Sequence, residues 1–208
     1  MHADDVPTYA HDPAKAARLL DEAGWKLAGA VRRNANGEPL VVELMTTAGN
    51  RSRELVSQVI QGQWRRLGID ARLKTEPPRV FFGETVTKRR FPHLALFAWV
   101  SAPESVPRTT LHSDQIPDAA NTWAGQNYSG YANPEMDRLL DSIEIELDRP
   151  RRVELWRRLQ HLYAQDLPAL PLFFRADGTI VPKGLEGVVP TGHKDPSTLW
   201  IESWRWRP

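Results

Sequence analysis

The chain has 208 residues, with 27 lysines and arginines, 26 aspartates and glutamates, and no cysteine. A formal net charge of +1 gives no global attraction to nucleic acid or to an anionic membrane surface. Hydrophobic residues make up 41% and charged residues 25%, a mixture that excludes wholesale disorder. The lack of cysteine excludes disulfide frameworks, cysteine-ligated zinc and thiol nucleophiles, and no apolar run is long enough to span a bilayer.

The N-terminus carries no targeting signal that can be read from its composition. Residues 1–5 contain neither a basic segment nor an apolar segment, so they do not form a signal peptide. The sequence then passes through Pro7 almost directly into a predicted helix. From this abrupt start we expect that the chain begins inside a longer protein.

The N-terminal half alternates predicted helices and strands. A helix over 12–24 has Asp12 as its N-cap, Pro13 in its first turn and Gly24 at its end, and Asn36-Gly37 indicates a hairpin turn. The next elements are a buried strand over 40–45, a helix over 51–67, a half-exposed strand over 69–74, a short helix over 79–88 and a strongly hydrophobic strand over 93–100. We expect the last strand at the centre of a sheet. The helix over 51–67 is expected to bury an apolar face made of Leu55, Val59, Ile60, Trp64 and Leu67.

The C-terminal half is predicted to be mainly helical. A long irregular segment over 101–133 is rich in proline, glycine and aromatic residues, and loops of this length in compact domains are usually functional. Helices follow over 134–147 and from about 149 to 163, then a hairpin at Asp177-Gly178 and a tail over 183–208 with several tryptophans. The order of elements predicts an α/β fold with one mixed β-sheet flanked by helices, in a single domain over 1–208.

No enzymatic constellation emerges from the residues. The six histidines are scattered without metal-ligand spacing, and the motifs of serine hydrolases, P-loops and dinucleotide-binding folds are absent. Asp137, Asp141 and Glu144 lie on the polar face of a predicted helix, where carboxylates are solvated. We therefore predict no catalytic residue, no metal site, no cofactor, no nucleic-acid partner and no enzyme activity.

The aromatic residues after the hydrophobic strand are the best candidate for a binding surface. In open α/β sheets, ligands bind beyond the carboxyl ends of the strands, and Trp99 lies at such an end. Packing of Trp99 into the core is an equally good interpretation of the same pattern.

Five stretches, in order along the chain, resemble segments of the oligopeptide- and dipeptide-type solute-binding proteins, extracellular family 5. The first stretch, 12–25, is similar to the family's D-P-x-K-A helix that ends E-A-G-aromatic, and 127–137 is similar to its N-Y-x-x-Y-x-N-P-x-x-D segment. The others are 63–69, 151–172 and 183–187. The resemblance implies the C-terminal lobe of a type II (cluster C) periplasmic-binding-protein fold, with the tail over 183–208 packing back toward an N-terminal lobe.

This resemblance also implies a function. Members of the family close two lobes around a peptide or other small solute and deliver it to the permease subunits of an ABC importer. We expect this chain to meet the membrane only through such an importer. They act in the periplasm or at the extracellular face. Hinge closure of this kind buries the solute in a cleft where a few polar groups give specificity.

The resemblance implies roles for individual positions of this chain. Trp99 corresponds to a tryptophan that lines the peptide pocket. The aspartate that pairs with a peptide's amino terminus is replaced by Ala102, and an arginine that some members use for the carboxylate is replaced by Leu96. A buried ammonium without a partner is costly, so either Glu104 or the other lobe supplies the charge, or the solute is not a free peptide. The residues predicted to form this lobe's half of the site are Trp99, Ser101, Glu104, Trp123, Asn127 and Tyr128.

Three alternatives remain open from the sequence. The chain could bind a non-peptide solute such as a sugar, an opine-like compound or a metallophore. It could be an enzyme built on the same scaffold, although no catalytic pair supports this. It could also be an interaction module that uses Trp200, Trp204 and Trp206.

Overall fold

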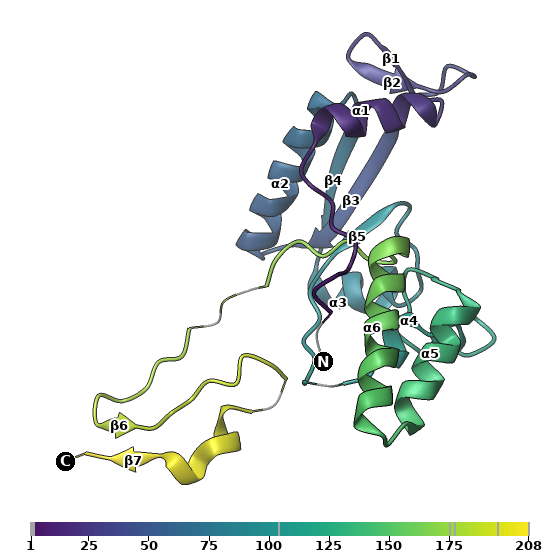
Figure 1. The fold of residues 1–208 in the computed structure, drawn as a ribbon. Coiled ribbons are helices and arrows are strands. Elements are labelled where there is room, and N and C mark those ends of the chain that lie inside the picture. Colours follow the sequence, from purple (N-terminus) through teal and green to yellow (C-terminus); the bar gives the residue numbers. More distant parts are fainter. Residues whose placement is uncertain (1–2, 104, 175, 177, 195, 208) are drawn as a thin grey trace.

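The computed structural model describes residues 3–103, 105–174, 176, 178–194 and 196–207 (Figure 1). Its α-helices are α1 (Pro13–Glu22), α2 (Arg51–Arg66), α3 (Pro78–Val80), α4 (Arg108–Leu111), α5 (Pro134–Ile145) and α6 (Arg149–Asp166). A π-helix spans Phe81–Val86, and 3-10 helices span Ser113–Gln115 and Ser197–Ser203. The strands are β1 (Lys26–Ala28), β2 (Val31–Arg33), β3 (Val41–Thr47), β4 (Asp70–Glu76), β5 (Leu94–Leu96), β6 (Leu185–Glu186) and β7 (Arg205–Trp206).

The longer helices begin where the sequence places a capping side chain. Asp12, Asn50, Asn133 and Asp148 each accept a hydrogen bond from a backbone N–H of the first turn, at 2.8 to 3.1 Å. Three of these helices also have proline in the first turn, where its missing N–H costs nothing. The predicted helix starts at 12, 134 and 149 are therefore confirmed.

The central sheet has the order β4-β3-β5, and all three strands run parallel. The α/β class is thus confirmed, but the antiparallel pairs of the described chain, β1–β2 and β6–β7, are separate ribbons and not part of the central sheet. The strand predicted over 93–100 is limited to β5 and lies at the edge, while β3 is the central strand. The prediction of a central strand was wrong because it took hydrophobic residues to be buried, whereas Trp99 and Val100 are apolar but exposed.

The two faces of β3 pack against different partners. Met45 contacts Phe81 and Val86 of the π-helix, so the π-helix covers this face. Because side chains alternate along a strand, Leu44 and Thr46 point to the opposite face, which α2 covers (Figure 1).

Helix α2 faces the sheet with only part of the side predicted, since Ile60, Trp64 and Leu67 are half-buried. Leu55 and Val59 are exposed, whereas Ser57 is buried. Two polar bridges fix this rotation: Arg53 Nη1 donates to Thr47 Oγ1 at 2.9 Å, and Gln61 Nε2 donates to the Ala71 carbonyl at 2.7 Å. The predicted apolar face is therefore wrong for Leu55 and Val59.

A second core joins the helices of the C-terminal half, where α5 and α6 lie side by side (Figure 1). Its buried members are spaced as one helical stripe on α5, with one residue each from α4 and α6. They are Leu111, Met136, Leu139, Leu140, Ile143 and Leu159. The helix predicted over 134–147 is thus present and buries one face, but it ends at Ile145, and Leu147, which the sequence also assigned to the apolar face, is exposed.

The N-terminal arm, residues 3–12, is fastened to α6. Asp5 pairs with Arg157 and lies 3.0 Å from Nε2 of His161, and the Tyr9 hydroxyl donates to the Ala164 carbonyl at 3.0 Å. The hydrogen bond from Arg157 is the main reason why the pKa of Asp5 lies well below its usual range.

The tail forms a small ribbon of its own, in which Leu185 pairs with Trp206 (Figure 1). A hydrogen bond between described residues joins it to the loop after β5: the Lys194 N–H donates to the Ser101 carbonyl at 3.2 Å. The predicted hairpin before it does not form in the described residues, because 170–174 and 178–181 contain no strand; Asp177 lies outside the described residues. That the tail packs toward a second lobe stays a prediction.

Candidate ligand-binding surface

The clearest candidate surface is an aromatic pair just beyond the carboxyl end of β5. The rings of Trp99 and Tyr128 stack with centroids 6.0 Å apart and planes 19° apart. Trp99 nevertheless keeps 53% of its surface exposed. An indole that is held by a neighbour and still exposed offers a flat apolar face to a solute.

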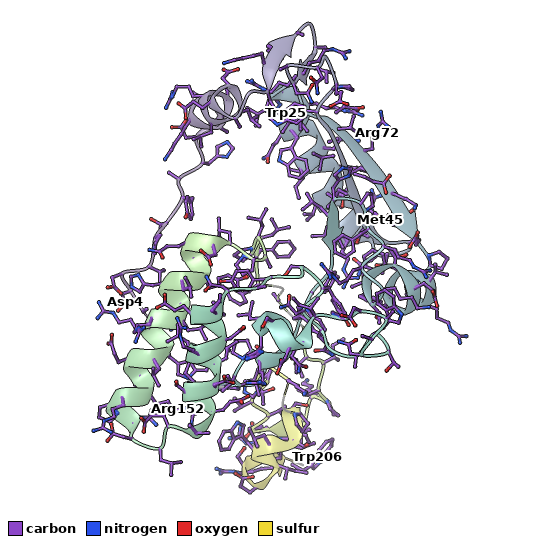
Figure 2. The ribbon with its side chains drawn as sticks, turned by 90° about the vertical axis from the view of Figure 1, so that its right-hand side faces the viewer. Asp4, Trp25, Met45, Arg72, Arg152 and Trp206 are labelled. Atoms are coloured by element: carbon purple, nitrogen blue, oxygen red, sulfur yellow. The ribbon has the colours of Figure 1, made fainter. Side chains whose placement is uncertain are left out.

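Further aromatic side chains connect this pair to the core. Phe97 packs edge-on against Trp99 at 5.8 Å and against Tyr128 at 6.2 Å. It also contacts Phe82 at 5.9 Å and the fully buried Phe81 at 6.4 Å. We call these five residues the aromatic cluster. Its inner end is buried against Met45, whose side chain is labelled in Figure 2, so the cluster extends from the core to the exposed indole of Trp99.

Trp99 and Tyr128 were predicted from the sequence as site residues, but the three phenylalanines of the cluster were not. Phe97 precedes Trp99 by two residues, and alternate residues of an extended chain point to the same side. That spacing is the signal that could have identified it. Phe81 and Phe82 come from the π-helix, and only the tertiary packing brings them to β5.

Asn127 holds the loop that carries Tyr128 from the interior, through bonds to His112, Ser129 and Tyr131. Its side chain has no exposed surface, and Nδ2 donates to the carbonyls of His112 at 3.0 Å and Tyr131 at 2.8 Å. Its Oδ1 accepts from the Tyr131 N–H and the Ser129 hydroxyl, both at 3.1 Å. The prediction that Asn127 contributes a surface to the ligand is therefore corrected, since the amide is fully used inside the fold.

The segment after Tyr128 is held by Arg89. Its Nε donates to the Tyr128 carbonyl at 3.3 Å, and its guanidinium fills the space where a side chain at Gly130 would lie. Gly130 has a φ of 70°, which suits glycine. Both contacts restrict the backbone that carries Tyr128.

The other predicted site residues are less closely grouped. Ser101 is exposed and its carbonyl is bonded to the tail, and Glu104 lies outside the described residues. Trp123 is half-buried with a φ of 61°, and none of the ring contacts found among the described residues links it to the aromatic cluster. Leu96 and Ala102 are half-buried and bring no charge to the surface.

A charged network behind Asn127 fastens α4 to α5. Arg108 pairs with Asp114 at 2.7 Å, with Glu144 at 3.4 Å and with Asp141. The hydrogen bond from Arg108 lowers the pKa of Asp141, so that carboxylate stays ionised. His112 lies 2.7 Å from Asp114, and its carbonyl holds Asn127.

Among the described residues, no group of three or more histidine, aspartate or glutamate side chains is arranged to hold a metal ion. In the same part of the chain, no helix has the length and hydrophobicity needed to cross a membrane. Stacking and apolar contact are what the exposed rings can supply.

Comparisons with known proteins agree with the resemblance seen in the sequence. The family described as "Bacterial extracellular solute-binding proteins, family 5 Middle" matches residues 1–118, more than half of the chain. The oligopeptide-binding protein AppA of Bacillus subtilis is 27% identical over 188 residues, which are 88% of this chain and 33% of AppA. The nickel-binding periplasmic protein of Escherichia coli is 28% identical over 165 residues, 79% of this chain and 30% of that protein.

Solved structures show the same relationship. The oligopeptide-binding protein of Thermus thermophilus, complexed with a pentapeptide, superposes with a TM-score of 0.81 at 32% identity, covering 90% of this chain and 34% of that one. AppA in complex with a nonapeptide gives 0.74 at 23% identity, covering 98% and 39%, which supports the fold alone. The chain spans about a third of the length of the curated relatives it matches. Its fold is that of the type II periplasmic binding proteins, and the chain belongs to the bacterial extracellular solute-binding proteins of family 5.

Proposed function

We propose that the chain is the C-terminal lobe of a two-lobed solute-binding protein that serves an ABC importer in the periplasm or at the extracellular face. The lobe contributes Trp99 and Tyr128 to the solute site, and the permease subunits of the importer are its partners. The observation that carries this proposal is the exposed indole of Trp99, stacked on Tyr128 beyond the end of β5. A surface tryptophan fixed in this way loses little conformational freedom when a solute covers it.

A peptide is the solute that the relatives favour. Several are named as oligopeptide- or dipeptide-binding proteins, and the Thermus thermophilus structure holds a pentapeptide. Such a ligand would lay an apolar side chain or a flat peptide group on the indole. Glu104 or the second lobe would then provide a partner for its amino terminus.

A non-peptide solute is the second candidate. The uncharged residues Leu96 and Ala102 favour it, since neither offers a counter-charge to a peptide terminus. One relative is named as a nickel-binding protein, and a structure of the same fold holds Ni(L-His). A metal complex or a sugar would place its own flat or apolar face on Trp99.

Native mass spectrometry of the two-lobed protein that contains this lobe, purified without refolding, distinguishes a peptide solute from a non-peptide solute. A co-purified peptide supports the first and a sugar or metal complex the second. The identified solute is then titrated into a Trp99→Ala variant, whose affinity should fall by about 1–3 kcal/mol if the indole stacks on the solute. Trp206→Ala is the matched control, because Trp206 is 64% exposed and lies in the tail. Equal affinity in wild type and Trp99→Ala would remove the aromatic pair from the site.

A further inference from the structure

A cavity of about 260 Å³ lies between α2 and the central sheet. Its sheet wall includes two pairs of residues that lie side by side on adjacent parallel strands, Leu44 with Leu73 and Thr46 with Thr75. Because alternate residues of a strand share a face, all four side chains point to α2. Met45 points to the aromatic cluster instead, so the cavity and that cluster lie on opposite faces of the sheet.

Ser57 stands on α2 midway between two polar bridges to the sheet. Arg53 Nη1 donates to Thr47 Oγ1 at 2.9 Å, and Gln61 Nε2 donates to the Ala71 carbonyl at 2.7 Å. Ser57 is four residues from each bridging residue, so the three side chains lie on one face of the helix. The long side chains of Arg53 and Gln61 span the gap between helix and sheet, which the serine side chain is too short to fill.

Ser57 has an unused hydrogen-bonding group inside this cavity. The residue is 2% exposed, and its Oγ has no hydrogen-bond partner among the described residues. Buried hydroxyls in native proteins are almost always bonded, because losing water without a replacement is costly. An unpaired hydroxyl that lines a cavity therefore indicates a polar occupant.

The charge of the cavity comes from Glu54, which is half-buried and lines it. Its Oε1 accepts from the Gly49 N–H at 3.0 Å, and its other oxygen has no hydrogen bond within the described part of the chain. Lys74 also borders the cavity, but it pairs in register with Met45 and its ammonium lies 3.4 Å from Glu76, on the other face of the sheet. Among the described residues that line the cavity, the carboxylate of Glu54 is thus the one charged group that faces its interior.

The other polar groups of the cavity favour an occupant that donates hydrogen bonds. Thr46 Oγ1 already donates to the Leu96 carbonyl at 2.8 Å, so it has only lone pairs left to offer. The free oxygen of Glu54 is likewise an acceptor, and the hydroxyl of Ser57 can accept as well. An ammonium group, which has three donors and no acceptor, matches these three oxygens in both charge and hydrogen bonding.

We propose that this cavity binds a small primary ammonium cation. Its N–H groups would donate to the free oxygen of Glu54 and to the hydroxyls of Ser57 and Thr46. A short alkyl chain would lie against Leu44 and Leu73. The volume is slightly below the range of about 300–1,000 Å³ for pockets that hold drug-sized ligands, as expected for a ligand of a few heavy atoms.

The test is an NMR titration of the isotope-labelled 208-residue chain with n-propylammonium chloride, observing backbone amides. Saturable shifts are expected at Thr46, Ser57 and Leu73. Two control titrations should not reproduce them: potassium chloride, which matches the ionic strength, and 1-propanol, which has the same alkyl chain without the charge.

Glu54→Gln should weaken the binding of n-propylammonium about tenfold, because it removes the charge while its amide oxygen can still accept from the Gly49 N–H. Ser57→Ala should weaken it about fivefold. The same variant should not lower the urea midpoint of the empty chain, because its hydroxyl has no partner to lose. Glu22→Gln, at an exposed carboxylate of α1, is the matched control and should leave binding unchanged.

Three results would overturn the proposal. Unchanged binding in Glu54→Gln, or shifts with 1-propanol equal to those with n-propylammonium, would contradict the assignment of a cation. An absence of saturable shifts at the cavity would leave water as its occupant. Shifts confined to Trp99 and Tyr128 would also contradict this proposal, but they would leave the proposed function intact.

Discussion

The buried amide of Asn127 should be among the most sensitive positions of the chain, and its replacement by alanine tests the argument about the aromatic surface. The side chain makes four hydrogen bonds, to the His112 carbonyl, the Tyr131 carbonyl, the Tyr131 N–H and the Ser129 hydroxyl. Alanine removes all four and leaves three backbone groups without this partner. The methyl group of alanine cannot replace any of them.

The expected loss of stability depends on how well water can reach each group that loses Asn127 as its hydrogen-bond partner. The bond to the His112 carbonyl is buried, so that oxygen should lose the full benefit of a partner, about 1–3 kcal/mol. The other three bonds are partly buried, and water can replace part of each, leaving about 0.5–1 kcal/mol apiece. We therefore expect Asn127→Ala to lower the free energy of unfolding by about 2.5–6 kcal/mol.

Urea unfolding followed by far-UV circular dichroism measures this loss, and near-UV circular dichroism reports the Trp99–Tyr128 stack. The midpoint should fall while the slope with urea stays unchanged, because the surface exposed on unfolding is the same. Asn36→Ala is the matched control: Asn36 is exposed in a turn, and its loss should cost within about 0.5 kcal/mol.

Asn127→Asp sharpens the test. This variant keeps the size of the side chain but directs a carboxylate toward two carbonyl oxygens, and an unpaired buried charge is more costly than a missing amide. It should be at least as unstable as the alanine variant. If Asn127→Ala costs less than about 1 kcal/mol, or Asn127→Asp is as stable as the wild type, the interior role assigned to this amide is wrong.

Two further predictions concern the N-terminal arm and a glycine. Because Arg157 lowers the pKa of Asp5, the ionised carboxylate stabilises the fold above its ordinary pKa of 3.8, and this contribution is lost as the pH falls through the lowered value. Asp5→Asn should therefore lower the urea midpoint at neutral pH by an amount that shrinks in acid; a deficit that does not change with pH would contradict the pairing. Gly125→Ala should destabilise the chain by more than about 2 kcal/mol, because φ is 95° and the new Cβ would lie 2.2 Å from the Gln115 carbonyl oxygen. Gly62→Ala, within α2 and with open space around it, should stabilise by about 0.5–1 kcal/mol; equal effects of the two alanines in thermal unfolding would refute the steric argument.

Capping residues, which act within one turn of the chain, determined where the helices begin. Capping at Asp12, Asn133 and Asp148 needs only a side chain and the backbone of the next turn, so it can be read along the chain. The apolar stripe of α5 is equally local, since its members recur every three or four residues. The family resemblance rests on the same kind of information, because short motifs stay recognisable in order.

Only the tertiary structure decided which apolar residues are buried. The sequence marked Leu55 and Val59 as core residues and the strand near Trp99 as the centre of the sheet, yet the first two are exposed and β5 is an edge strand. Polar bridges from Arg53 and Gln61 to the sheet set the rotation of α2, and such contacts join residues that periodicity does not relate.

The candidate site, too, was predicted in part from the sequence and decided in part by the tertiary structure. Trp99 and Tyr128 could be named from composition and motif, but their stacking needs β5 and the 101–133 loop to meet in space. Asn127 carries no mark in the sequence that separates an amide facing a solute from one buried among carbonyls. The sequence thus determined the local elements and the family, and the fold decided the surfaces, because burial and partners depend on residues distant along the chain.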